Sequence, residues 1–141
     1  MAPGNLVRFG VSLDGKLLER FDEVNDRKGC TNRSEAIRDL IRDSLVREQW
    51  EHGKGEAVGT ITLVYGHDTP DLADRLTDLQ HDHYKEIVST LHVHLDAHHC
   101  LEVLVLRGRA DKLKAIADRL IGTRGVKHGT FSATAEGHAL A

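Results

Sequence analysis

The chain has 141 residues, enough for one ordinary domain or two small ones. Its formal net charge of −3 excludes a generally basic surface for nucleic acid, whereas its ten histidines suggest a metal. Cys30 and Cys100 lie far apart without a CxxC pair, which argues against a disulfide framework or a zinc finger. Because no apolar run resembles a signal peptide or a membrane helix, we expect a soluble cytoplasmic protein.

The first predicted unit, residues 1–50, consists of a strand and two helices. Alternating apolar residues predict a strand over Leu6–Leu13. Asp14 is placed to cap the first helix and Gly29 to end it, and Asn32 with Glu35 resembles a capping box for the second. A lone strand in so small a unit lacks a partner, so the pattern favours a dimer that pairs two such strands. The apolar face of this strand would carry Val7, Phe9, Val11 and Leu13.

Two paired strands would form a ribbon of the kind that fits the major groove of DNA. Its outer face would present Arg8, Gly10 and Ser12, of which Arg8 can bond guanine and Ser12 can bond many base edges. Asn32 and Arg33 begin the second helix, where free N–H groups can hold a phosphate. From these residues alone, a dimerisation module without a DNA role remains the alternative.

The second predicted unit begins after a polar linker, EHGKGE, at residues 51–56. Residues 57–133 follow the order strand, helix, strand, strand, helix, strand, and residues 134–141 are expected to form a flexible tail. Thr69 and Pro70 would start the first of these helices, which is expected to run to about His83. This βαββαβ order is the ferredoxin-like arrangement, so the predicted fold class is α+β.

The segment LHVHLDAHHC, at residues 91–100, carries a candidate metal site. Alternation puts His92 and His94 on one strand face, about 7 Å apart. If His94 lies opposite Cys100, then His92 lies opposite Glu102, and one ion could bridge both rings and the thiolate. A slip of one residue would turn Cys100 away. Imidazole and thiolate suit a borderline transition metal, and Glu102 could orient a ring.

Two segments, NRSEAIRD and QHDHYKEIVSTLHVHLDAHHCLEVLVL, resemble the nickel-responsive transcriptional regulator family (NikR). The first resembles the second helix of ribbon-helix-helix repressors, and the likeness extends from about Val7 to His128. The resemblance implies a cytoplasmic repressor of nickel-uptake genes that is active with nickel bound. It also implies a homotetramer, a dimer of dimers, on a palindromic DNA operator. Each chain would contribute a ribbon-helix-helix unit and an ACT-type, ferredoxin-like core.

The same resemblance implies particular ligands. One Ni(II) per chain would be held by His92, His94 and Cys100, and by His81 of a neighbouring chain. Glu35 and Asp39 match a pair that holds a second cation, typically K⁺, near the DNA-binding unit. This sequence departs from the family pattern at Gly10 and in the loop before Thr69, which lacks basic residues, so the operator sequence is left open.

Other functions are alternatives to a nickel-responsive repressor. A metal-storage or metal-trafficking protein would explain the histidines but not the strand–helix–helix unit, and a repressor could sense another transition metal. An amino-acid-binding ACT core would leave the histidine pattern unexplained, and no catalytic carboxylate pair, nucleophile or phosphate loop indicates an enzyme. Cys30 is interpreted as a buried small residue, and His98 and His99 as candidates for extra metal at high loading. Four further histidines are interpreted as surface residues: His52, His67, His128 and His138.

Overall fold

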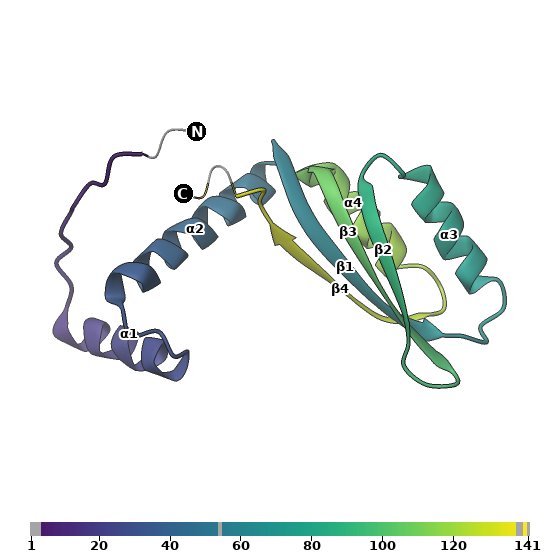
Figure 1. The fold of residues 1–141 in the computed structure, drawn as a ribbon, viewed down its shortest axis with the longest axis horizontal. Helices are drawn as coiled ribbons and strands as arrows, with labels where there is room; N and C mark the ends of the chain where they lie inside the picture. The colour runs from purple at the N-terminus through teal and green to yellow at the C-terminus, as the bar shows by residue number, and fades with distance from the viewer. Residues whose placement is uncertain (1–3, 54, 138–139, 141) are drawn as a thin grey trace. The chain divides into compact units, whose positions relative to one another are not determined.

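The computed structural model describes residues 4–53, 55–137 and 140, which divide into two compact units. The first unit reaches Leu45 and the second begins at Val46. The elements, labelled in Figure 1, are α1 (Gly15–Arg27), α2 (Arg33–His52), β1 (Glu56–Gly66), α3 (Leu72–Asp82), β2 (Ile87–His94), β3 (His99–Arg109), α4 (Ala110–Ile121) and β4 (Val126–Thr134). None of the described helices is long and apolar enough to cross a membrane.

The helix ends of the first unit confirm the capping predictions. Oδ1 of Asp14 accepts a hydrogen bond from the backbone N–H of Lys16 at 2.9 Å. Gly29 follows α1 with φ of 75°, a left-handed conformation that suits glycine after a helix. Oδ1 of Asn32 accepts from the backbone N–H of Glu35 at 3.3 Å, so α2 begins where the sequence indicates.

The predicted strand over residues 6–13 is absent from the single chain. Residues 4–13 have no regular secondary structure, and their apolar side chains are exposed, with Leu6 at 97% and Phe9 at 68%. The physical reason is that a strand requires a neighbouring backbone to satisfy its N–H and C=O groups. The prediction itself placed that neighbour on a second copy.

The end of α2 belongs to the second unit. The helix includes Glu51 and His52, which were predicted to lie in the linker. Trp50 packs edge-on against Phe131 of β4, with ring centroids 5.2 Å apart, and its indole N–H donates to the carbonyl of Thr134 at 2.9 Å. These contacts fix the last turn of α2 against the sheet.

The second unit has the predicted βαββαβ order, which confirms the α+β class. Its strands form one antiparallel sheet in the order β2-β3-β1-β4, with β1 and β3 in the centre (Figure 1). The strand predictions hold to within a few residues. The first helix of this unit starts later than predicted, because α3 begins at Leu72, after Asp71, and not at Pro70.

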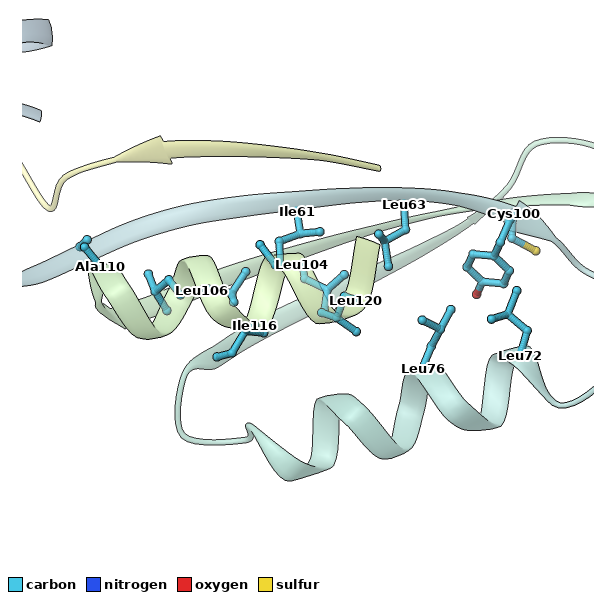
Figure 2. Close-up of a cluster of buried hydrophobic side chains, with 14 residues drawn as sticks. Ile61, Leu63, Leu72, Leu76, Cys100, Leu104, Leu106, Ala110, Ile116 and Leu120 are labelled. Atoms are coloured by element: carbon cyan, nitrogen blue, oxygen red, sulfur yellow. The ribbon is translucent and has the colours of Figure 1, made fainter. Parts of the chain in front are cut away.

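Two helices cover the same face of this sheet, as Figure 2 shows for α3 and α4. Ile61 and Leu104 from the central strands pack with Leu120 of α4, while Leu72 and Leu76 of α3 extend the core towards Cys100 (Figure 2). The other face has no helix over it in the described chain. There Leu91 of β2 remains 60% exposed and Val93 37% exposed.

Candidate metal centre

The pairing of β2 with β3 determines which candidate metal ligands lie side by side. His94 lies opposite Cys100, and His92 lies opposite Glu102, which is the register that the metal hypothesis required. Because Cys100 is fully buried and Glu102 is 8% exposed, this face of the pair points towards the helices and the core. A one-residue slip would have sent Cys100 to the opposite face.

Two imidazoles approach the Cys100 sulfur. Its Sγ lies 3.7 Å from Nδ1 of His94 and 3.4 Å from Nδ1 of His67. The sequence predicts His67 only as a surface residue, but its exposed ring, directly after β1, also reaches Cys100. It approaches Cys100 because β1 pairs with β3, where Gly66 lies opposite His99. That non-local pairing is the signal that would have identified His67, and a linear motif does not contain it.

His92 is held by a buried carboxylate. Its Nδ1 lies 3.1 Å from Oε1 of Glu102, which also accepts a hydrogen bond from the Tyr65 hydroxyl at 2.6 Å. The side-chain N–H of Gln80 donates to Oε2 of Glu102 at 3.1 Å, and Thr90 donates to Gln80 at 3.1 Å. A carboxylate on Nδ1 fixes the ring and favours the tautomer that presents Nε2 to a metal. Glu102 therefore lies where a carboxylate could orient the His92 ring.

Burial governs the titration of the buried groups at this site. Desolvation raises the pKa of the Cys100 thiol, and the nearby carboxylates of Glu102, Asp96 and Asp68 raise it further. Desolvation also raises the pKa of Tyr65, and its hydrogen bond to Glu102 acts in the same direction. Burial and the nearby carboxylates both favour the neutral thiol of Cys100, and a bound cation would act in the opposite direction and favour the thiolate.

His81 lies apart from these ligands. Among the described side chains, the one group of three or more potential ligands close enough to share an ion is His67, His94 and Cys100. His81 is exposed in the last turn of α3, directly after the Gln80 that bonds Glu102. The single chain therefore brings His94 and Cys100 together, with His92 beside them, and leaves His81 outside.

The candidate DNA-contacting residues lie in the first unit. Arg8, Gly10 and Ser12 are exposed in the segment before α1. Asn32 caps α2 through its side chain, as described above. Arg33 makes a two-pronged ion pair with Asp22, at 2.9 Å from Nε and 2.6 Å from Nη2.

The candidate second-cation pair is already bonded to arginines. Glu35 contacts Nη1 of Arg42 at 3.3 Å and Nη2 of Arg38 at 2.6 Å, and Asp39 contacts the same Arg42 nitrogen at 2.9 Å. The hydrogen bond from Arg38, followed by that from Arg42, lowers the pKa of Glu35. A cation bound between these carboxylates would have to replace Arg42.

Comparison with known proteins defines the class. Residues 7–48 match the family described as ribbon-helix-helix protein, copG family, and residues 58–134 match the NikR C terminal nickel binding domain. The chain therefore combines a ribbon-helix-helix DNA-binding unit with a nickel-binding domain, which is the composition of a transcription regulator and not of an enzyme.

Similar proteins extend over nearly the whole chain. One from Geobacter metallireducens, assigned as a nickel-responsive regulator, is 61% identical over 97% of this chain and 99% of its own length. One with the same assignment from Geobacter sulfurreducens is 59% identical over 97% of this chain and 99% of its own length. Another, from Pyrococcus furiosus, is 58% identical over 94% of this chain and 96% of its own length. The chain belongs to the nickel-responsive regulator family.

Proposed function

We propose that this protein is a cytoplasmic repressor that binds a palindromic operator at nickel-uptake genes when nickel is bound. The observation that carries the proposal is the strand register that sets His94 opposite Cys100 and His92 opposite Glu102, within the nickel-binding domain. Three histidines and one cysteine would fill all four positions around the ion and leave none open for a substrate. Such a closed set suits a sensor of the ion and not a hydrolytic enzyme.

The proposed nickel ligands are His92, His94 and Cys100 of one chain and His81 of a neighbouring copy, with one ion per chain. The contact between Cys100 and His94 supports the three ligands from one chain, and so does the contact of Glu102 with the His92 ring. The exposure of His81 on α3 supports its donation to another copy. Nickel would supply the positive charge that favours the Cys100 thiolate.

The proposed DNA-binding form is a dimer through residues 6–13. Their apolar side chains are exposed in one chain, and pairing two such segments would bury them between copies. The outward residues Arg8 and Ser12 would then read base edges, with Gly10 between them leaving one position without a side chain. The start of α2, at Asn32 and Arg33, would hold a DNA phosphate.

The proposed tetramer uses the second unit. The helix-free sheet face carries partly exposed apolar residues, among them Leu91 and Val93, which a second copy would cover. The same assembly would bring a neighbour's His81 to the nickel ligands. Two ribbon dimers in one tetramer would match two halves of a palindrome.

Nickel would act by coupling the metal site of the second unit to DNA binding by the first. An ion that recruits His81 from a neighbour would fix α3 there, and Gln80 links that helix to Glu102 and His92 of its own chain. A 10- to 100-fold gain in operator affinity needs only about 1.4–2.8 kcal/mol of coupling. We also propose that K⁺ takes the place of Arg42 between Glu35 and Asp39 in the DNA-bound form.

The test is operator binding with and without nickel. A duplex can be selected from a random library by the nickel-loaded protein, and its affinity measured for wild type, His92→Ala and the control His128→Ala, which changes an exposed histidine of β4. We expect nickel to tighten binding 10- to 100-fold in wild type and control but not in His92→Ala. Nickel binding with no DNA affinity in any state would instead indicate a metal-storage or metal-trafficking protein.

A further inference from the structure

A pocket of about 380 Å³ lies at the end of β3 that is remote from Cys100. It opens where β3 runs into α4, beside the first residues of β1 and β2. A volume of this order is that of a small-molecule site, and the candidate nickel ligands take no part in it. Six charged side chains of the described second unit line it: Glu56, Lys85, Glu86, Arg107, Arg109 and Lys112.

The buried carboxylate of this pocket is already neutralised. Glu86 is 8% exposed, and its Oε1 lies 2.6 Å from Nζ of Lys112. Its side chain lies against Gly108, where an added Cβ would meet the Glu86 Cγ at 3.3 Å. The hydrogen bond from Lys112 lowers the pKa of Glu86, so this carboxylate is charged and paired. The other basic side chains therefore decide which charge the pocket attracts.

Two of those basic side chains retain unused donors. Lys85 is exposed, and it makes no ion pair or hydrogen bond within the described chain. Arg107 meets the carboxylates of Glu136 and Glu56 through Nε, at 2.5 Å and 4.0 Å. Its two terminal nitrogens donate no hydrogen bond within the described chain, so this edge of the guanidinium remains open to an oxyanion.

Arg109 can add a third donor group. Its Nη2 lies 3.1 Å from Oδ2 of Asp111, but both side chains are more than half exposed, so the ion pair is weak and a ligand can replace it. The lining carries four positive and two negative side chains, a surplus of two positive charges. A phosphate group carries about two negative charges at neutral pH and pairs with the arginine fork, so it matches this surplus.

We propose that this pocket binds the phosphate group of a small molecule, with Lys85, Arg107 and Arg109 as the groups that contact it. The concave shape and the volume favour a small phosphorylated compound over the backbone of DNA, which is the other source of the same group. The site shares no residue with the proposed nickel ligands or with the first unit, so it does not depend on the proposed function.

Pyrophosphate is the probe, titrated by calorimetry into the full-length protein without added metal at fixed ionic strength. We expect wild type to bind it, and Arg107→Gln and Lys85→Gln each to weaken binding at least tenfold. The matched control is Lys114→Gln, which removes the same charge from an exposed position of α4 outside the pocket and should stay within twofold of wild type. Lys85 makes no contact that folding needs, so its substitution tests the pocket even if Arg107→Gln is unstable.

The outcomes separate this inference from the proposed function. Absence of pyrophosphate binding in wild type overturns the inference, and so does affinity within twofold of wild type in Lys85→Gln. An equal loss in Lys114→Gln also overturns it, because the attraction would then be general to the surface. If Lys85→Gln weakens operator binding and pyrophosphate does not bind, these residues contact the DNA backbone, and the small-molecule site is wrong while the regulator stands. Pocket-dependent pyrophosphate binding in a protein that binds no operator supports the inference and contradicts the proposed function.

Discussion

The carboxylate of Glu102 lies 3.1 Å from Nδ1 of His92, across the β2–β3 pair, and it also accepts a hydrogen bond from Tyr65. The arrangement joins a candidate ligand on an edge strand to the buried part of the second unit. It also links that ligand to α3, because Gln80 donates to the other carboxylate oxygen.

The first prediction concerns this carboxylate. Glu102→Gln should weaken nickel binding about 10- to 100-fold, because the His92 ring loses the charged acceptor that orients it. The measurement is a competition titration against a chelator of known nickel affinity. Glu56→Gln, which changes an exposed carboxylate at the far end of the same sheet, should bind nickel as the wild type does. Equal affinities for Glu102→Gln and wild type would show that the His92 ring needs no such support.

The second prediction tests the ribbon. Phe9→Asp should weaken dimerisation about 10- to 100-fold or more, because burial of a phenylalanine contributes about 1.5–3 kcal/mol and a charge in its place must be desolvated. Sedimentation at several concentrations measures the change. Gly10→Ala is the matched control, since a Cβ at Gly10 meets no atom within 4 Å and that position faces outward in the proposed ribbon. In the proposed tetramer the second units would still join chains in pairs, so Phe9→Asp should convert tetramers to dimers. A tetramer that withstands Phe9→Asp would place the first unit's interface elsewhere.

The sequence predicted most of the secondary structure of both units, apart from the strand over residues 6–13, and the reason is local. Alternation and caps around residues such as Asp14 and Asn32 are short-range signals, and they placed the helix and strand ends closely. Alternation alone leaves the register of β2 and β3 open, but the short loop between His94 and His99 allows few alternatives. The contribution of His67 could not be predicted, because it depends on the pairing of β1 with β3, two strands far apart in the chain.

The third prediction concerns Arg33. Its guanidinium is held by Asp22 and must leave that carboxylate to contact a DNA phosphate with the same nitrogens. Asp22→Asn should therefore tighten DNA binding about two- to fivefold at low salt, the range expected for an exposed ion pair. Asp26→Asn, on the same helix, controls for the change in net charge. If both variants bind equally well, Asp22 does not compete with phosphate for Arg33.

The fourth prediction concerns the pH dependence of stability. A hydrogen bond from Lys112, with an Nζ–Oε1 distance of 2.6 Å, lowers the pKa of the buried Glu86 from its ordinary 4.5. Since the folded pKa is depressed, this stabilisation is complete above about pH 4.5 and is lost as the pH falls through the folded value.

Glu86→Gln should therefore lower the free energy of unfolding by about 1 kcal/mol at pH 7, a modest loss because Lys112 is half exposed, and by less at pH 3. Urea denaturation at the two pH values measures the difference. A loss that is the same at both would show that the ion pair contributes nothing beyond packing.

The most direct test of the account is the absorption spectrum of the purified protein titrated with nickel, beside Cys100→Ala. We predict a thiolate-to-nickel charge-transfer band that saturates at one ion per chain and is absent from Cys100→Ala. A band that survives the substitution, or no band in the wild type, would contradict the assignment of Cys100 as a nickel ligand. The ribbon-helix-helix unit would then belong to a regulator that answers to a different signal.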